Sequence, residues 1–373
     1  MKYDNQLRYA KTIIREYDGS IPLASWLKEF FRNHKQMGST DRRTLSAITY
    51  SFYRLGHLSF ASVDDRLAAA IAASPDLNTL KEYFGYLFPE IDDEKKIFPA
   101  FTRFSDGVDH NKLAKSMLIQ PLVYARIRPG KKVEVERKLK AAGVEYSVCD
   151  ENCIALEPGV PLQKILNVNA EVVIQDKTSQ QTGILFTEAK SMLDQDEINV
   201  WDCCAASGGK SIMAYDTMGN IKLTVSDIRE SIIHNLSSRF HEAGIKGYKK
   251  FVADLSAPAN HFPRDPFDVV IADVPCSGSG TWARTPEQLY FFNPDKIAHY
   301  RNLQKSITKN VIASVRKGGF LVYITCSVFR QENEDVLAHL GSLGFRTVYS
   351  RLFVGYEDRA DTLFGAILTN SEA

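Results

Sequence analysis

The sequence predicts an α/β protein whose largest part is a Rossmann-like domain with a mainly parallel, seven-stranded sheet. Two observations predict it. From about residue 171 onward, short runs rich in Val, Ile and Phe alternate with helical stretches, as they do in doubly wound sheets. Residues 1–112 instead carry apolar residues at helical spacing without β alternation, which predicts a helical bundle.

In the helical region, residues 20–35 predict one helix, with Ser20 as a candidate cap and Pro22 in the first turn. A second amphipathic helix is expected over residues 39–58, capped by one of its first three residues, Ser39, Thr40 or Asp41. Further helices are expected over 64–74 and 80–88.

Residues 113–170 change character and predict a small α+β unit. A strand over 120–130 ends at Pro-Gly, a helix covers 131–144 and a hairpin covers 145–158. This unit holds the densest basic cluster of the chain: Arg126, Arg128, Lys131, Lys132, Arg137, Lys138 and Lys140. A solvated helix face is the ordinary interpretation of such a cluster, and phosphate binding is the functional one.

The expected strands of the large domain are 198–204, 222–228, 248–254, 267–275, 318–327, 345–353 and 364–370. The first five end in acidic residues or cysteines. Since ligands of doubly wound sheets bind at the carboxyl ends of the strands, these ends predict the active site. Cys276 and Cys326 follow two of these buried runs about fifty residues apart, which calls for a chemical explanation.

Composition excludes several classes of protein. A net charge of +1 gives no argument for a nucleic-acid partner, so any such partner must bind through local charge. No stretch approaches the ~20 apolar residues of a membrane span, and a cytoplasmic protein is expected. The six cysteines contain no C-x-x-C, so no metal site is expected, and Cys149, Cys153 and Cys203 are expected to pack as small apolar residues. The absence of a heptad pattern favours a monomer.

The glycine loop in "WDCCAASGGKS" (201–211) follows a strand and opens a helix. It is not a P-loop, because Cys204 stands where the first glycine belongs, and no G-x-G-x-x-G occurs. Asp227, at the end of the next strand, suits either a helix N-cap or the two hydroxyls of a ribose. Loop and carboxylate together favour S-adenosylmethionine, with ribose on Asp227, adenine near Asp254 and methionine over the loop. The loop residues are Cys204, Ala205, Ala206, Ser207, Gly208, Gly209 and Lys210.

These motifs resemble the RsmB/Sun family of RNA cytosine-5 methyltransferases. "DCCAASGGKS", "DVPCSGSG", "YITCS" with "ENE" (332–334), and "IQDKTSQQTG" (174–183) each match a family motif, and together they cover roughly residues 171–370. Residues 113–170 resemble the family's ferredoxin-like unit, and residues 1–112 its NusB-like RNA-binding domain. The resemblance implies domains at 1–112, 113–170 and 171–373.

The resemblance also implies roles. Cys326 adds to cytosine C6, Cys276 assists release, and Asp273, which also borders the cofactor, bonds the base in a protonated form that burial must stabilise. Lys210 bridges the cofactor loop and the base. From the residues alone, either cysteine could be the attacker. Arg284 and the basic cluster are expected to hold an RNA, most simply ribosomal RNA, with the target cytosine unpaired or flipped out.

Two departures from the family pattern bear on these roles. Ser207 replaces a proline, which is expected to loosen the cofactor loop, and Ala283 replaces an arginine beside Arg284. The alternatives are the same chemistry on transfer RNA or DNA, and a non-catalytic RNA-binding factor in ribosome assembly.

Overall fold

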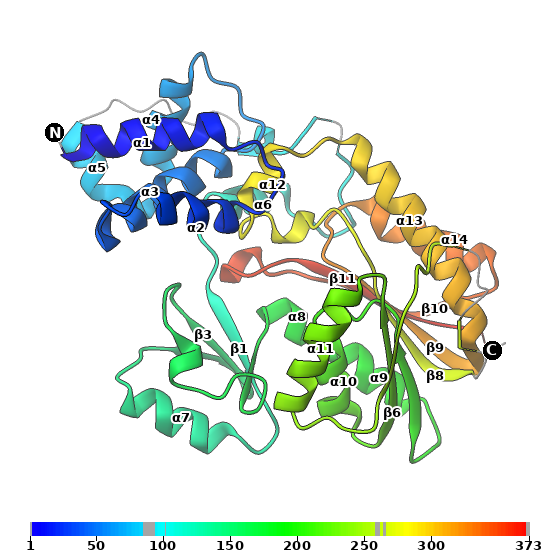
Figure 1. Ribbon diagram of the computed structural model, residues 1–373. Helices are drawn as coiled ribbons and strands as arrows, with labels where there is room; N and C mark the ends of the chain where they lie inside the picture. The colour runs from blue at the N-terminus through cyan, green and yellow to red at the C-terminus, as the bar shows by residue number, and fades with distance from the viewer. Residues whose placement is uncertain (1, 85–93, 101, 258–261, 264–265, 371–373) are drawn as a thin grey trace. The chain divides into compact units, whose positions relative to one another are not determined.

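The structure is a computed structural model that describes residues 2–84, 94–100, 102–257, 262–263 and 266–370 (Figure 1). It divides into two compact units. The helical unit comprises Met1–Thr102, Asp109–Pro121 and Thr281–Pro294, and the sheet unit comprises Arg103–Val108, Leu122–Gly280 and Asp295–Ala373. This division differs from the three expected domains in one respect above all: residues 281–294 belong to the helical unit. The boundaries of the three domains stay a prediction.

The helical unit is built from amphipathic helices. They are α1 (Lys2–Glu16), α2 (Leu23–Asn33), α3 (Ser39–Arg54), α4 (Val63–Ala73), α5 (Asn78–Phe84), α6 (His110–Met117) and α12 (Pro286–Tyr290). Leu45, Ile48 and Phe52 on one face of α3 are buried in the core of this unit. The part of the expected 80–88 helix beyond Phe84 lies outside the described residues.

The expected helix caps are wrong. Pro22, not Ser20, is the N-cap of α2, because Ser20 lies in a turn where its backbone N–H donates to Asp18 Oδ1. Gly38 is the N-cap of α3, and it provides no side-chain cap bond.

Buried bonds explain why residues 281–294 join the helical unit. The Arg54 guanidinium donates to the Ala283 carbonyl at 2.7 Å, and Glu287 accepts the free N–H of Leu23 in the first turn of α2 at 3.2 Å.

The sheet unit begins with the small α+β part. Its antiparallel sheet has the order β2-β3-β1-β4, made of β1 (Val123–Ile127), β2 (Ser147–Asp150), β3 (Cys153–Leu156) and β4 (Val172–Ile174), and α7 (Lys132–Ala141) connects β1 to β2. The expected strand, helix and hairpin are confirmed. The strand order is that of ferredoxin-like folds, with the second helix reduced to the 3₁₀ turn Leu162–Lys164. Strand β4 lies beyond residue 170, the expected end of this unit.

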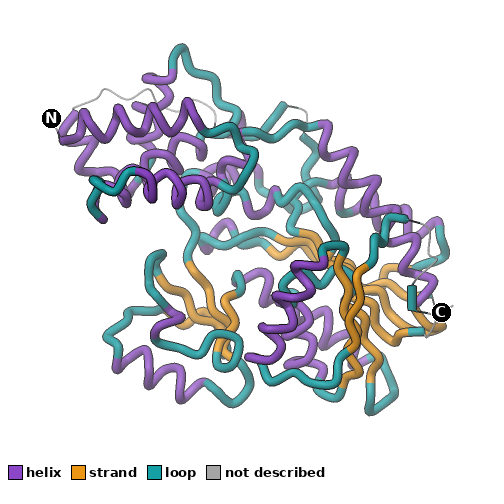
Figure 2. The backbone as a smooth tube through the Cα atoms, viewed as in Figure 1, coloured by secondary structure: helices purple, strands orange, loops and turns teal. Residues whose placement is uncertain are grey.

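The large sheet confirms the predicted fold class (Figure 2). Its order is β10-β11-β9-β8-β5-β6-β7. Strands β9, β8, β5, β6 and β7 pair in parallel, β11 pairs antiparallel with β9, and β10 pairs antiparallel with β11. The strands are β5 (Ile198–Asp202), β6 (Ile221–Asp227), β7 (Lys249–Val252), β8 (Phe267–Asp273), β9 (Val315–Thr325), β10 (Arg346–Phe353) and β11 (Leu363–Thr369).

Helices cover both faces of this sheet, as in doubly wound folds. They are α8 (Lys177–Gln181), α9 (Gly183–Ser191), α10 (Gly209–Met218), α11 (Glu230–Glu242), α13 (Asp295–Val311) and α14 (Glu334–Ser342). Neighbouring residues of β5 point to opposite cores: Val200 packs with Ile212 and Leu236, and Trp201 packs with Ile307. Within the described residues, no helix is long and apolar enough to cross a membrane.

Candidate functional site

The predicted site residues gather at the carboxyl edge of the five parallel strands. Asp202 ends β5, Asp227 ends β6 and Asp273 ends β8, while Cys326 directly follows β9. Because β9, β8, β5 and β6 are consecutive neighbours, the ends of these strands form one continuous edge.

The glycine loop has a left-handed backbone that glycine permits. Gly208 has φ +85°, and a Cβ there would lie 2.6 Å from the Phe240 ring, so only glycine fits. A Cβ on Gly209 would meet nothing within 4 Å, which leaves open space at the start of α10. The loop therefore offers exposed backbone at a helix N-terminus, which suits a small polar ligand.

Ser207 is hydrogen-bonded to Arg239, so the expected loosening of the cofactor loop is wrong. Arg239 Nη1 donates to the Ser207 hydroxyl at 2.7 Å and to its carbonyl at 3.0 Å, and Arg239 Nε donates to Asn169 Oδ1. The serine hydroxyl thus gains a bond that a proline could not make.

Asp227 is buried and acts as an acceptor. Ala206 N–H of the glycine loop donates to its Oδ2 at 3.0 Å, and Arg229 donates to it through both backbone and side chain. Burial alone raises the pKa of Asp227, but the bonds from Arg229 outweigh it and hold that pKa below its ordinary value. Asp227 is therefore ionised, as a carboxylate that accepts from ribose hydroxyls must be.

Two apolar side chains beside Asp227 are unusually exposed. Ile228 directly follows Asp227 in the chain and is 59% exposed. Val252 of β7 pairs with Asp227 of β6 and is 49% exposed. Exposed apolar groups next to an ionised carboxylate fit the adenosine of S-adenosylmethionine, with the carboxylate at ribose and the apolar groups at the adenine ring. Sequence reasoning missed both residues, because the pattern marks them only as ordinary strand residues.

Asp254 is at the expected edge but its carboxylate has another role in this structure. It is exposed, and Oδ1 accepts from both the N–H and the hydroxyl of Ser256. These bonds lower the pKa of Asp254. A contact between Asp254 and adenine stays a prediction.

Lys210 and Asp273 are brought together as an ion pair, 3.2 Å from Nζ to Oδ2. Lys210 Nζ also donates to Ser179 Oγ at 2.9 Å, and Gln175 Nε2 donates to the same hydroxyl. The burial that the prediction required for a protonated Asp273 is missing, since its side chain is 31% exposed and faces an ammonium. Sequence reasoning assigned no role to Ser179. Its position in the family motif at 174–183 was the feature that could have pointed to the site.

Asp202 lies below this pair and is fully buried. Ser211 donates to its Oδ2 at 2.5 Å, while Oδ1 has no hydrogen-bond partner. Burial raises the pKa of Asp202 to about 7.

Cys276 and Cys326 are the central pair of the site. Their sulfur atoms are 3.2 Å apart, and both side chains are partly exposed. The S–H contact between the two thiols and burial together raise the pKa of Cys276 well above its ordinary value. Cys153 and Cys203 are buried, as expected, and Cys149 is partly exposed.

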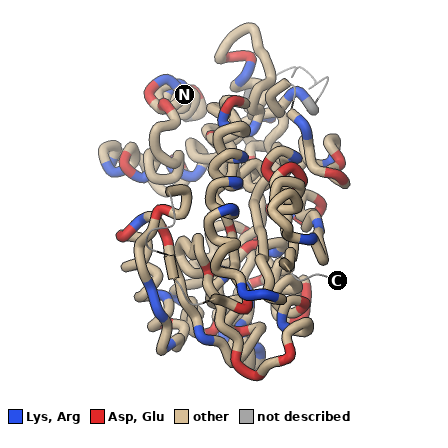
Figure 3. Tube along the Cα trace, turned by 90° about the vertical axis from the view of Figure 1, so that its right-hand side faces the viewer, with Lys and Arg blue, Asp and Glu red and all other residues tan. Residues whose placement is uncertain are grey.

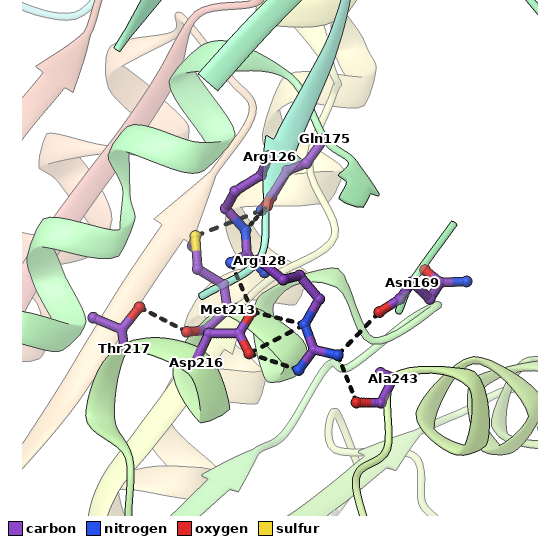
Figure 4. Close-up of polar contacts among 8 residues, drawn as sticks. All are labelled: Arg126, Arg128, Asn169, Gln175, Met213, Asp216, Thr217 and Ala243. Atoms are coloured by element: carbon purple, nitrogen blue, oxygen red, sulfur yellow. Dashed lines mark hydrogen bonds and ion pairs between the residues drawn. The ribbon is translucent and has the colours of Figure 1, made fainter. Parts of the chain in front are cut away.

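Two residues of the basic cluster at 126–140, Arg126 and Arg128, are engaged within the protein, so they do not serve the expected phosphate role; for the others that role stays a prediction. Arg126 and Arg128 are nearly buried and both bind Asp216 of α10, each with a 2.7 Å contact (Figure 4). Arg126 also donates to Gln175, and Arg128 to two backbone carbonyls. Arg137 and Lys138 pair with Glu134 and Glu171. Lys131, Lys132 and Lys140 are exposed. Sequence reasoning missed the buried ion pair with Asp216. Arg126 and Arg128 stand in an otherwise apolar stretch, and that pattern could have indicated it.

A different basic stripe lies on α13, on the side of the molecule that Figure 3 faces. Arg301, Lys305 and Lys309 recur every four residues, so they share one helix face. Among the described residues, no carboxylate lies within 4.0 Å of these three. Arg284 belongs to the helical unit, and its role stays a prediction.

Comparison with known proteins agrees with this geometry. Residues 190–342 match the family model described as 16S rRNA methyltransferase RsmB/F. A probable ribosomal RNA small subunit methyltransferase B of Bacillus subtilis is 29% identical over 61% of this chain and 50% of its own length. The chain thus spans about half the length of the curated relatives it matches.

Two solved structures share the fold. PH0851 superposes with a TM-score of 0.70 at 19% identity and covers 92% of this chain and 93% of its own. NSun6 from Pyrococcus horikoshii, solved with SFG, gives a TM-score of 0.59 at 14% identity and covers 71% of this chain and 94% of its own.

Proposed function

Because residues 190–342 match the family model of 16S rRNA methyltransferases RsmB/F, we propose that this chain is an S-adenosylmethionine-dependent RNA cytosine-C5 methyltransferase acting on ribosomal RNA. One observation carries the proposal: two thiols lie 3.2 Å apart at the ends of neighbouring parallel strands, beside a glycine loop. Cytosine C5 is a poor nucleophile until a thiolate adds to C6, so this chemistry needs a reactive cysteine at that place.

The cofactor is S-adenosylmethionine, which supplies an electrophilic methyl group when bound. Asp227 would hold its ribose, and the loop Cys204–Lys210 would bind its methionine part. Ile228 and Val252, both exposed beside Asp227, would contact the adenine.

Cys326 is the nucleophile in this proposal. The 3.2 Å contact allows either sulfur to donate; in this proposal the Cys276 thiol donates its S–H toward Cys326 as Cys326 attacks. As Cys326 Sγ bonds to C6, electrons of the C5–C6 double bond shift into the ring, and N3 takes up a proton through the Lys210–Asp273 pair. Asp273 accepts a hydrogen bond from the exocyclic amine, and C5 is now nucleophilic.

Cys276 assists release. After C5 has gained its methyl group and a base has removed the C5 proton, the bond between C6 and Cys326 breaks and N3 gives back its proton. The Cys276 thiol, 3.2 Å away, donates a hydrogen bond to the departing sulfur and makes it a better leaving group.

The α13 stripe is the best-placed candidate for phosphate contacts, because its three cations have no carboxylate partners within the described part of the chain. A protein that neutralises phosphates loses affinity steeply with salt. Replacing Lys305 and Lys309 by glutamine is expected to lower the slope of log affinity against log salt by about 2. An unchanged slope rejects this surface.

The chemistry is tested with purified protein, S-adenosylmethionine and small-subunit ribosomal RNA. Cys326→Ala is expected to abolish both methylation and the covalent RNA adduct on denaturing gels, while Cys276→Ala accumulates the adduct. The assignment is wrong if Cys276→Ala abolishes the adduct and Cys326→Ala retains it. Mass spectrometry of nucleosides from ribosomal and transfer RNA separates the two substrates. Calorimetry that detects no S-adenosylmethionine binding would favour a non-catalytic assembly role.

A further inference from the structure

Two fully buried polar side chains next to the catalytic loops have no part in the mechanism so far. Glu332 and Asn333 follow Cys326 by six and seven residues, and both have 0% exposure. Burying such polar groups costs free energy unless they form hydrogen bonds inside the protein.

Glu332 holds the loop that carries Cys276. Its Oε1 and Oε2 each accept from the backbone N–H of Ser277 at 3.1 Å, and Oε2 accepts from the Ser277 hydroxyl at 2.9 Å. Ser277 directly follows Cys276, so this carboxyl fixes the backbone at the release thiol. The Tyr323 hydroxyl donates to the Glu332 carbonyl at 2.6 Å and holds Glu332 itself in place.

Asn333 holds the loop that carries Cys326. Its Oδ1 accepts from the Thr325 hydroxyl at 2.5 Å, and its Nδ2 donates to the Ser327 carbonyl at 2.9 Å. Thr325 and Ser327 flank Cys326 on either side. Nδ2 also donates to Ser105 Oγ at 2.8 Å, which anchors the amide from its far side.

Other bonds join the two loops directly, among them the one from Val328 N–H to the Ser279 hydroxyl at 2.9 Å. The Ser327 hydroxyl lies 3.3 Å from that of Ser277 and 3.2 Å from that of Ser279, and Gly280 N–H donates to the Cys326 carbonyl at 2.9 Å. Glu332 thus contributes the bonds to Ser277 beside Cys276, and Asn333 those to Thr325 and Ser327 beside Cys326, while a side-chain bond from Ser327 also reaches Glu332.

We propose that Glu332 and Asn333 are positioning residues with divided roles: Glu332 places the release thiol Cys276, and Asn333 places the nucleophile Cys326. The assignment rests on the proposed function. It predicts that the two residues affect different steps of one reaction, which a purely structural role would not do.

The test uses near-isosteric changes. In Glu332→Gln only one acceptor oxygen remains for the two Ser277 donors, and the new amide donors face them. Methyl transfer in a single turnover is expected to stay within about threefold of wild type, while adduct resolution slows about tenfold or more, as for loss of a hydrogen bond to a charged group. In Asn333→Asp an acceptor replaces the donor that faces the Ser327 carbonyl, and adduct formation is expected to slow by a similar factor.

Controls separate positioning from folding. Asp335→Asn changes a partly exposed carboxylate in the same segment and should leave both steps unchanged. Ser277→Ala removes only one of the Glu332 bonds and should slow resolution in the same direction by a smaller factor. If both steps fall together in each variant, in proportion to lost thermal stability, the divided assignment is wrong.

A second measurement needs no RNA. Alkylation of the intact protein by iodoacetamide, mapped by mass spectrometry, reports the accessibility and nucleophilicity of each thiol. Glu332→Gln should change the Cys276 rate and Asn333→Asp the Cys326 rate, each at least threefold. Equal rates in wild type and variants overturn the positioning claim. If wild type forms no adduct with any RNA but the alkylation rates split as expected, the proposed function fails and the positioning claim stands.

Discussion

Asp216 is the residue whose loss should most clearly weaken the attachment of the small α+β part to the large sheet. Its carboxylate is 5% exposed and receives Arg126 Nη1 and Arg128 Nη2 at 2.7 Å each, plus the Nε of Arg128 (Figure 4). Arg126 lies in β1 and Arg128 directly follows it, while Asp216 lies on α10. Asp216→Ala removes the only carboxylate that these two buried guanidinium groups bind in the described structure.

The magnitude follows from what the arginines keep. Removing one partner of a buried ion pair costs about 3–5 kcal/mol. Two cations lose their partner here, but Arg126 keeps its bond to Gln175 and Arg128 keeps two backbone carbonyls. The cost therefore stays near 3–5 kcal/mol rather than doubling. Asp216→Asn keeps one acceptor oxygen and should cost about half as much.

The assay is urea unfolding, combined with hydrogen exchange of peptides from residues 122–174, which reports the small part separately. The matched control is Arg137→Ala, which breaks an exposed pair with Glu134 and should have little effect on the free energy of unfolding. If Asp216→Ala matches this control in both measurements, the cluster is solvated and the reasoning about its burial is wrong.

Three further predictions concern the active-site edge. Burial raises the pKa of Asp202 to about 7 from an unfolded value near 4, so between these pH values the folded state binds one proton more than the unfolded state. The free energy of unfolding should therefore fall as the pH rises from 4 to 7. Urea unfolding of Asp202→Asn should show a smaller fall over the same range. Ser179→Ala removes the hydroxyl that holds Lys210, so kcat should drop about 10-fold or more with RNA affinity unchanged, and Ser179→Thr should restore it. Dilute hydrogen peroxide should oxidise Cys276 and Cys326 to a disulfide with a mass loss of two hydrogens, and dithiothreitol should reverse the loss of activity; a mass gain of oxygen without cross-linking would contradict this.

The sequence was enough to predict the large sheet and the meeting of its reactive residues. Strand periodicity located all seven strands, and parallel strands necessarily bring their carboxyl ends to one edge. Asp227, Asp273 and the two cysteines could therefore be assigned to one site without coordinates.

Partnerships between distant residues could not be predicted. Arg126 and Asp216 are 90 positions apart, and the local sequence around either residue does not indicate that they pair. The sequence does not distinguish a basic residue that binds a phosphate from one that binds a buried carboxylate, so Arg126 and Arg128 were interpreted wrongly. The burial of Asp273 was misjudged for a related reason, since the strand pattern does not show that Lys210 reaches it.

The spacing of the two sulfurs shows where the sheet stops determining the chemistry. Neighbouring strands lie about 4.8 Å apart, and β8 and β9 keep that pairing up to Asp273 and Ile324, with one further bond from Val274 N–H to the Ile324 carbonyl. Cys276 and Cys326 lie beyond this last bond, yet their sulfurs are 3.2 Å apart, closer than the strands that deliver them. That distance is set by the loop backbones together with the two side-chain rotamers, and the loop backbones are fixed by buried polar groups rather than by the ladder. Core substitutions under the strands should consequently lower stability without changing the balance between adduct formation and release, whereas substitutions in the loop network should change that balance.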